Sequence, residues 1–376
     1  MPSVTDANFY ENDLNRLEAS GRRRTLTEAL GRDFSSNDYL ALAGSTALRT
    51  AAAEAIARGV GIGSGGARLL RGNSPEHIAL EADAARFFGS ESALFVGSGY
   101  VANSLILSTL PQRDDLVLHD ALIHASIHEG MRLSRARYQC FAHNDVDAAA
   151  DAIDQWRARG GRGTPWIAIE TIYSMDGDIA PVADFANLAD RTGAMLLIDE
   201  AHAAGICGPK GRGLAAQLQG RENIVTLATC GKAMGCEGAL ILAPAILRDF
   251  LVNRGRGFIF STAPSPLIAA IVRESLAIVA LADDRRDRLR ELIAKTGFHF
   301  GPLGIPSSGT HIQPVIVGED GSTMGIAAAL QDRGFDVRGI RPPTVPTGAA
   351  RLRISITLNT DETEIAALAD ALGDLL

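Results

Sequence analysis

The sequence predicts an α/β protein, with a large domain built on a mostly parallel sheet and a smaller C-terminal α+β domain. From about residue 45 to 270, short apolar runs alternate with amphipathic helical patterns. Such continuous runs are typical of strands buried between two layers of helices. After about residue 275 the pattern changes, and a long charged helix precedes a few strands and helices. The length of 376 residues also favours two domains.

The expected elements follow in chain order. An N-terminal segment (1–45) contains an amphipathic helix and a basic turn within residues 10–30. The large domain (46–275) contains the strand runs SALFVGSG, DDLVLHD, PWIAIETIYS, AMLLIDEAH, NIVTLATC and GALILAP, with helical patterns such as SPEHIALEADAARFFG and DVDAAADAIDQWRARG between them. The small domain (276–376) contains a long helix, the run THIQPVIVG, a helix, the run ARLRISITLN and a final helix.

Composition and charge exclude several functions. The chain is 46% hydrophobic and 21% charged, as is typical of a soluble globular protein. Its net charge of −8 argues against nucleic-acid binding, and the basic stretch GRRRTL is too short to change this. The most apolar late stretch is interrupted by Arg273 and Glu274, so we expect no membrane span. Four cysteines at no metal-like spacing and an N-terminus without a secretory pattern predict no metal site and a cytoplasmic location.

One lysine stands in an unusual setting. The chain has only three lysines, and Lys232 lies between Gly231 and Ala233 within the apolar stretch LATCGKAMGCEGALIL. Arginine stays charged near neutral pH, whereas lysine can lose its proton and act as a nucleophilic amine. Lys232 is therefore a candidate for imine formation. A surface lysine in a loop is the alternative that this stretch alone leaves open.

Ligands in open parallel sheets lie beyond the carboxyl ends of the strands, so the residues after each apolar run are the candidates for function. After ALFV, the glycine-rich turn at Gly99 and Tyr100 opens a helix, where free backbone N–H groups suit a phosphate. After LLI come Asp199 and His202. A buried aspartate needs a partner such as a cation, and the pyridinium nitrogen of pyridoxal phosphate (PLP) is one.

Each of these signals has an ordinary alternative, namely a plain turn or a helix cap. Thr229 and Lys232, however, follow the next apolar run, NIVTLA. One edge of the sheet is thus expected to carry a phosphate-type turn, a buried acid, a histidine and a lysine. Desolvation and a nearby cation would both lower the pKa of the lysine, as imine chemistry requires. The combination favours a PLP site with Lys232 as its Schiff-base lysine.

Several longer stretches resemble the fold-type I PLP enzymes, and among these the α-oxoamine synthases. They are GSGGARLLRGNSPEHIALE, FVGSGYVAN, HDALIHASIHEGMRLS, ETIYSMDGDIAP, LLIDEAHAAGICGPKGRG and TCGKAMGCEGA. The resemblance extends over nearly the whole chain, from FSSNDYLAL to ARLRISITLN. It implies the fold-type I architecture, PLP as cofactor and acyl transfer as the activity.

The resemblance also implies roles for individual residues. Around the cofactor they are Gly99, Tyr100 and Thr229 at the phosphate, His124 stacked on the ring, Ser174 and His202 at the ring oxygen, Asp199 at the ring nitrogen and Lys232 in the imine. His124, Asp199, His202 and Lys232 are the catalytic set. Around the substrate, Arg353 would bind the amino-acid carboxylate and Asn37 would lie nearby. The family forms homodimers with a shared active site, and Thr262 would reach the phosphate of the neighbouring subunit.

Other residues keep open or structural interpretations. Arg341 would either meet a distal carboxylate of the acyl chain, which suits its planar fork, or cap the segment RPPTVP. His119 and His143 follow strand ends, but no sequence feature pairs them with the candidate site, so both are expected to be structural.

The segment RPPTVPTGAARLRI resembles the family members that join L-alanine to a pimeloyl thioester in biotin synthesis. We therefore expect those small-molecule substrates, with the acyl group carried by coenzyme A or by an acyl carrier protein. A synthase that uses glycine or serine with another acyl-CoA is one alternative, and a PLP aminotransferase is a second. A nucleotide-binding module is a third, although the run GVGIGSGGARLLRGNS has neither a Walker nor a dinucleotide pattern.

Overall fold

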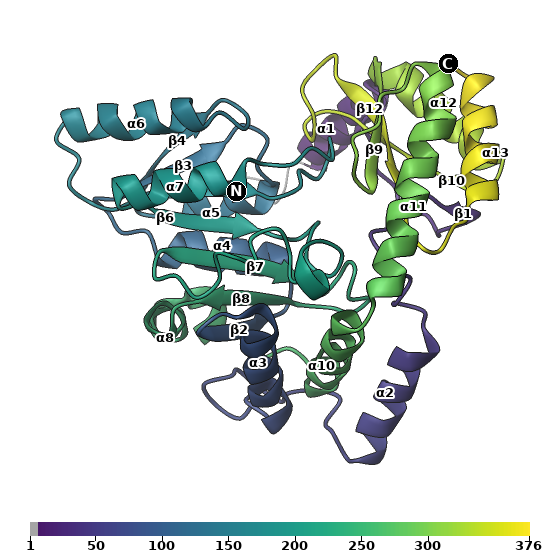
Figure 1. Cartoon of the computed structure of the whole chain (residues 1–376). Coiled ribbons are helices and arrows are strands. Elements are labelled where there is room, and N and C mark those ends of the chain that lie inside the picture. The colour runs from purple at the N-terminus through teal and green to yellow at the C-terminus, as the bar shows by residue number, and fades with distance from the viewer. Residues whose placement is uncertain (1–6) are drawn as a thin grey trace. The chain divides into compact units, whose positions relative to one another are not determined.

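The computed structural model describes residues 7–376, which divide into two compact units. The large unit consists of Asn37–Ser174 and Asp178–Leu289. The C-terminal unit consists of the chain up to Ser36, the short segment Met175–Gly177 and Arg290–Leu376. Figure 1 shows the elements of both units in the colours of the chain.

The large unit is built on a seven-stranded sheet in the order β2-β8-β7-β6-β5-β3-β4. The strands are β2 (Ser92–Val96), β3 (Leu116–Asp120), β4 (Arg137–Phe141), β5 (Pro165–Glu170), β6 (Met195–Asp199), β7 (Ile224–Thr229) and β8 (Ala239–Ala243). Only β8 runs against its neighbours β2 and β7. The predicted mostly parallel sheet is therefore confirmed. Strand β4 was not predicted, because four of its five residues are exposed and form no apolar run.

Helices cover both faces of this sheet, as Figure 1 shows. The helices of the large unit are α2 (Thr46–Ala57), α3 (Pro75–Phe88), α4 (Gly99–Thr109), α5 (Ala125–Leu133), α6 (Val146–Ala158), α7 (Val182–Thr192), α8 (Ala245–Arg254), α9 (Arg256–Ile259) and α10 (Pro266–Ala280), of which α2 packs on α10 and not on the sheet. Successive strand residues point to opposite faces, so β5 contributes Ala168 to one core cluster and Ile167 to another. The first cluster includes Leu105 of α4, and the second includes Phe185 of α7.

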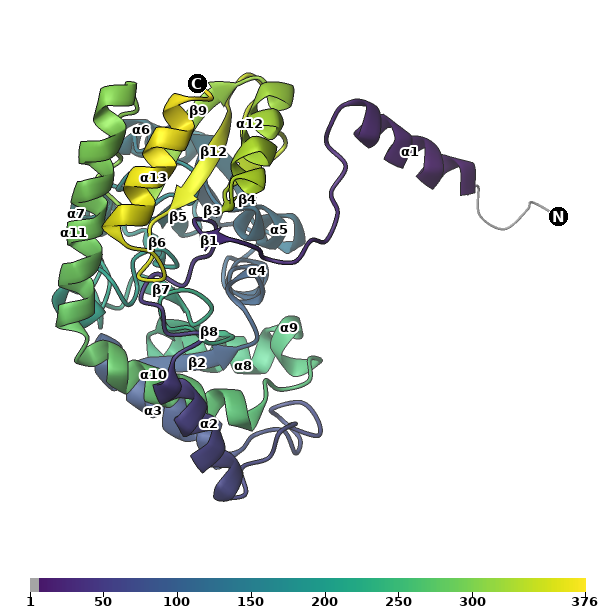
Figure 2. The same cartoon turned by 90° about the vertical axis from the view of Figure 1, so that its right-hand side faces the viewer.

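The C-terminal unit has a three-stranded antiparallel sheet in the order β11-β12-β9. Its strands are β9 (Ile312–Gly318), β11 (Arg338–Ile340) and β12 (Ala350–Ser355), and a separate short pair joins β1 (Arg32–Asp33) to β10 (Phe335–Asp336). The helices are α1 (Ala7–Ala19), α11 (Asp283–Phe300), which starts in the large unit, α12 (Asp320–Asp332) and α13 (Glu362–Gly373). Figure 2 shows α11, α12 and α13 beside the sheet, which fits the predicted α+β pattern. Within residues 7–376, none of the helices has the length and apolar character needed to cross a membrane.

Candidate active site

Most residues singled out from the sequence lie at one edge of the large sheet. Asp199 ends β6, Thr229 ends β7, and Gly99 opens α4 shortly after β2. Strand β6 is parallel to β7, and β2 has the same direction because β8, which lies between β2 and β7, is antiparallel to both. The three carboxyl ends therefore face the same side, where ligands bind in sheets of this kind.

Lys232 begins a chain of hydrogen bonds that ends at Asn37. Its Nζ lies 2.7 Å from Nε2 of His202, and Nδ1 of His202 lies 2.7 Å from the hydroxyl of Tyr39. The Tyr39 hydroxyl donates to Oδ1 of Asn37 at 2.8 Å. When the lysine donates to Nε2, the proton of a neutral His202 ring must be on Nδ1, from which it is donated to Tyr39. The relay thus sets the tautomer of His202 and brings the predicted Asn37 into the same network as Lys232.

Asp199 is buried, with 4% of its surface exposed, and accepts hydrogen bonds from two neutral donors. The Asn103 side-chain amide donates to Oδ2 at 2.7 Å, and the Ala201 backbone N–H donates to Oδ1 at 2.8 Å. A buried carboxylate is strongly stabilised by a cation, which these neutral groups do not supply. A protonated pyridine nitrogen fits this need, so the position of Asp199 agrees with its predicted role.

Asn103 also connects Asp199 to His124. Its side-chain amide donates to Oγ of Ser126 at 2.9 Å, and the Ser126 hydroxyl lies 2.8 Å from Nδ1 of His124. The backbone N–H of Ser126 donates to the same Nδ1 at 3.2 Å, so the proton of a neutral ring must be on Nε2. Partial burial of the ring lowers the pKa of His124, and so does the charge of Lys232, whereas Asp199 acts in the opposite direction. His124 as a residue is exposed, and a neutral imidazole at such a position is suited to stack on a cofactor ring.

The start of α4 provides the predicted phosphate position. Ser98 caps the helix by accepting a hydrogen bond from the Val101 backbone at 3.2 Å. The backbone N–H groups of Gly99 and Tyr100, in the first turn, have no acceptor within the helix. A Cβ atom on Gly99 would lie 3.7 Å from the hydroxyl of Thr229, so this hydroxyl faces the helix start. Amide donors and a hydroxyl at a helix N-terminus fit a phosphate group.

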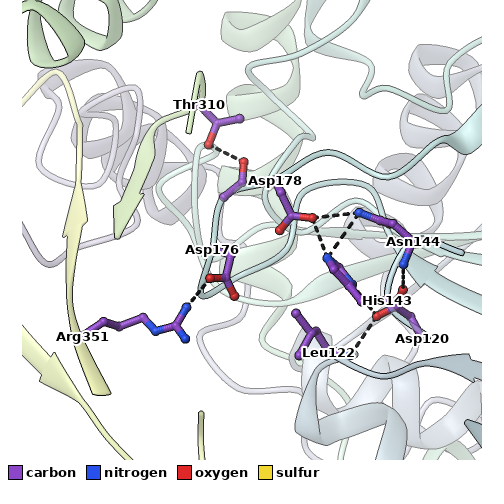
Figure 3. Close-up of polar contacts among 9 residues, drawn as sticks. Asp120, Leu122, His143, Asn144, Asp176, Asp178, Thr310 and Arg351 are labelled. Carbon is purple, nitrogen blue, oxygen red and sulfur yellow. Dashed lines mark hydrogen bonds and ion pairs between the residues drawn. The ribbon is translucent and has the colours of Figure 1, made fainter. Parts of the chain in front are cut away.

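Ser174 lies at the start of a loop that is held on both sides. The residue is buried, and the loop beyond it carries Asp178, whose Oδ2 lies 2.7 Å from Nε2 of His143. The other ring nitrogen of His143 lies 2.8 Å from Oδ1 of Asp120, at the end of β3. Figure 3 shows His143 between the two carboxylates. These contacts agree with the structural role predicted for His143, which stays a prediction, and they join β3 to the loop that follows Ser174.

The predicted substrate residues Arg353 and Arg341 belong to the C-terminal unit. Arg353 lies on β12 and is buried, with Nη1 donating to Oγ of Ser355 at 2.8 Å. Arg351, on the same strand, forms an ion pair with Asp176 (Figure 3). Arg341 donates to Sδ of Met324 at 2.9 Å and has an Nε without a partner among the described residues. The substrate roles of both arginines, and the two alternatives for Arg341, stay predictions.

Thr262 lies in the large unit and is exposed. It forms an isolated β-bridge with Ala67 of the glycine-rich segment, and the Ala263 N–H donates to the Gly66 carbonyl at 2.9 Å. These contacts give the glycine-rich segment a structural function, since it supports the loop that carries Thr262.

Sequence reasoning missed three residues of the network, namely Tyr39, Asn103 and Glu170. Tyr39 is fully buried in the segment FSSNDYLAL, and Asn103 is a buried polar residue within an apolar helix. The sequence does contain a signal for Asn103, because a polar amide within an apolar helix is buried and must find hydrogen-bond partners. Glu170 ends β5 directly before the loop of Ser174, and it pairs with Asp199 of the neighbouring strand β6.

Comparisons with known proteins agree with this geometry. The sequence profile of the class I and II aminotransferases matches residues 32–372. Two curated relatives are each named 8-amino-7-oxononanoate synthase. The one from Anaeromyxobacter dehalogenans is 42% identical and the match covers 96% of this chain and 95% of its own, and the one from Burkholderia thailandensis is 41% identical with 96% of each chain covered.

Solved structures give the same result. A lysine-to-alanine variant of the serine palmitoyltransferase from S. paucimobilis, with a bound PLP–myriocin aldimine, superimposes with a TM-score of 0.89 at 25% identity, covering 98% of this chain and 96% of its own. The 8-amino-7-oxononanoate synthase of Francisella tularensis has a TM-score of 0.78 at 25% identity, covering 92% and 97%. The chain therefore belongs to the PLP-dependent α-oxoamine synthases, which are acyltransferases of the class I and II aminotransferase family.

Proposed function

We propose that this enzyme condenses L-alanine with a pimeloyl thioester, with loss of CO₂, to form 8-amino-7-oxononanoate for biotin synthesis. The observation that carries the proposal is the relay from Lys232 through His202 to Tyr39, at the same sheet edge as the buried Asp199. The names of the curated relatives, which match over nearly the whole chain, support this substrate pair.

When bound, PLP supplies an electron sink that stabilises negative charge at the Cα atom of the amino acid. The side chains of this protein then handle protons. The Nζ atom of Lys232, which the contact with His202 holds in place, would accept the Cα proton. Asp199 keeps the ring nitrogen protonated, and the amide of Asn103 keeps the carboxylate of Asp199 oriented.

Substrate binding is assigned by the family resemblance. Arg353 binds the carboxylate of alanine, since a guanidinium makes two parallel hydrogen bonds to a carboxylate where an ammonium cannot. This fixes the amino acid relative to the proton-accepting amine. Asn37 lies near the substrate and also accepts the Tyr39 hydroxyl at the end of the relay. Arg341 either meets the distal carboxylate of the pimeloyl chain or caps its own loop.

The working unit in this proposal is a homodimer, in which Thr262 contributes to the phosphate site of the partner. A groove of about 1080 Å³ lined by residues of α4, α5, α8 and α9 supports a second copy as partner. Its large apolar side chains include Tyr100, Leu133 and Phe260, which are 49%, 61% and 73% exposed. Exposed large apolar side chains with polar and charged residues around them are typical of protein interfaces. The four cysteines are free, as in proteins of the reducing cytoplasm, where we place the enzyme.

The first test is the absorbance of the protein with PLP, alone and during titration with L-alanine, glycine and L-serine, alongside Lys232→Ala. We expect a visible imine band in the parent protein that shifts at the lowest concentration with alanine, and release of free thiol from pimeloyl-CoA. The Lys232→Ala variant should lack the parent band. A colourless parent protein would contradict the assignment of Lys232.

A second candidate is a synthase that uses serine or glycine, because serine palmitoyltransferases are among the structural neighbours. A spectral response that is strongest with either of these amino acids would move the assignment there. Amino transfer to a keto acid without thiol release would instead favour an aminotransferase. Parallel thiol-release assays with pimeloyl-CoA and with the pimeloyl ester of an acyl carrier protein decide which carrier donates the acyl group.

A further inference from the structure

Glu170 is a buried acid that the proposed mechanism does not use. It is the last residue of β5, and 2% of its surface is exposed. In the parallel pairing of β5 with β6 its partner is Asp199. Paired residues on neighbouring strands lie about 5 Å apart and point to the same face of the sheet. Two buried carboxyl groups therefore lie side by side at the edge that binds the cofactor.

The two acids differ in their hydrogen bonds. Asp199 accepts from Asn103 on one oxygen and from the Ala201 backbone on the other, which stabilises its charged form. Glu170 has one oxygen, Oε1, without a partner among the described residues. Two adjacent buried carboxylates cannot both stay charged at low cost, so one of them holds a proton. The hydrogen bonds place that proton on Glu170.

The electrostatic surroundings agree with this. Burial, the largest cause, and the neighbouring Asp199 both raise the pKa of Glu170 well above its ordinary range. The ammonium group of Lys232 and the backbone N–H groups of His124 and Ser174 act in the opposite direction.

We propose that Glu170 is a neutral carboxylic acid beside Asp199, and that it leaves Asp199 as the charged carboxylate at the ring nitrogen. Glu170 is a positioning residue, because it acts through Asp199. The role of Asp199 at the ring nitrogen rests on the proposed function, whereas the protonation of Glu170 rests on the contacts of the protein itself.

The test compares Glu170→Gln, Glu170→Ala and the matched control Glu200→Gln. Glutamine resembles a neutral carboxylic acid in shape, with an oxygen that accepts hydrogen bonds and an amino group that donates them. Glu200 is also buried, but it accepts from the Thr171 hydroxyl at 3.0 Å, from the Leu214 backbone at 3.1 Å and from the Ala215 backbone. These three donors require a carboxylate that only accepts hydrogen bonds. In Glu200→Gln the amide N–H groups face the same donors, so Glu200 is the buried acid that is expected to be charged.

The first readout is the infrared band of protonated carboxylic acids in the protein without PLP, at mildly alkaline pH. We expect the Glu170→Gln variant to lose intensity in this band and Glu200→Gln to keep it. The second readout is PLP affinity, followed by absorbance. Glu170→Gln keeps a neutral side chain of the same size beside Asp199 and should stay within about threefold of the parent protein. Glu170→Ala leaves a cavity beside Asp199 and should bind PLP about 10- to 100-fold more weakly.

An unchanged infrared band in Glu170→Gln would overturn the proposal, and so would PLP binding as weak in Glu170→Gln as in Glu170→Ala. The infrared comparison needs no cofactor and only the Gln variant, so it decides the question even if Glu170→Ala does not fold. It also separates this inference from the proposed reaction. If Glu170→Gln loses the infrared band but the parent protein does not condense alanine with pimeloyl-CoA, the proposed substrates are wrong and the neutral Glu170 is still supported.

Discussion

The contacts of His143 lead to a prediction about stability and pH. Both ring nitrogens face carboxylates, with Nδ1 2.8 Å from Asp120 and Nε2 2.7 Å from Asp178. A carboxylate only accepts hydrogen bonds, so both nitrogens must carry protons and the ring must be positively charged. Burial, the largest single cause, lowers the pKa of His143, but the hydrogen bonds and charges of Asp120 and then Asp178 outweigh it and raise the pKa above 6.5.

Replacing His143 by glutamine removes the charge and one of the two donors. Asp120 is fully buried, and a hydrogen bond between charged groups there contributes about 1.5–3 kcal/mol. The side chain of Asp178 is 36% exposed, so its bond contributes only about 0.2–1 kcal/mol. We therefore expect His143→Gln to lower the free energy of unfolding by about 2–4 kcal/mol below pH 6.5, where the parent ring is fully charged.

The sign of the pH dependence follows from the raised pKa. The native state holds the His143 proton more tightly than the unfolded state, so this stabilisation is complete below pH 6.5 and is lost as the pH rises through the native pKa. The difference between parent protein and variant should shrink over that interval. The measurement is the urea midpoint of both proteins without PLP at a series of pH values, compared at equal m-value.

A matched control is Asp190→Asn, which breaks an exposed ion pair with Arg221 of 3.0 Å and should change the free energy of unfolding by less than about 1 kcal/mol at every pH. A gap between His143→Gln and the parent protein that stays constant or widens as the pH rises would refute the charged ring.

Two further predictions concern the relay and the link between Asp199 and His124. Asn103→Ala removes the side-chain amide that donates to both Asp199 and Ser126, at a cost of about 1–3 kcal/mol. We therefore expect PLP to bind about 5- to 150-fold more weakly in an absorbance titration. An unchanged PLP affinity would show that this link is not needed for cofactor binding. Tyr39→Phe removes the hydroxyl that accepts the Nδ1 proton of His202. We therefore expect kcat in the thiol-release assay to fall about 5- to 10-fold at an unchanged KM for alanine. A higher KM at an unchanged kcat would instead assign Tyr39 to substrate binding.

Local pattern predicted the parts of the fold that are buried on both sides. Strands such as β5 and β6 consist of buried residues and appear in the sequence as continuous apolar runs. The edge strand β4 gave no such signal, because four of its five residues are exposed to solvent and need not be apolar. The pairing of β1 with β10 joins residues about 300 positions apart, and no local pattern of two-residue strands reveals it.

The candidate site divides in the same way. Asp199, Thr229 and Lys232 follow directly from the rule that function lies beyond the carboxyl ends of parallel strands. Tyr39 and Asn103 could not be placed by that rule, because the first precedes the large sheet in the chain and the second lies within a helix. Their importance depends on contacts with residues 163 and 96 positions away, which only the folded chain brings together.

These distant contacts also determine where the protons of the site lie. The Ser126 backbone fixes the acceptor nitrogen of His124, Lys232 and Tyr39 together fix the two nitrogens of His202, and Asn103 holds the carboxylate of Asp199. All of these donors belong to the protein, so the arrangement exists before any ligand arrives and no reorganisation is needed when charge develops. A substitution at Asn37, at one end of the relay, should therefore change the hydrogen bond of Lys232 at the other end. Substituting Asn37 removes the acceptor of the Tyr39 proton, and the hydroxyl is then free to turn and donate to His202, which would move the ring proton to Nε2 and break the contact with Lys232.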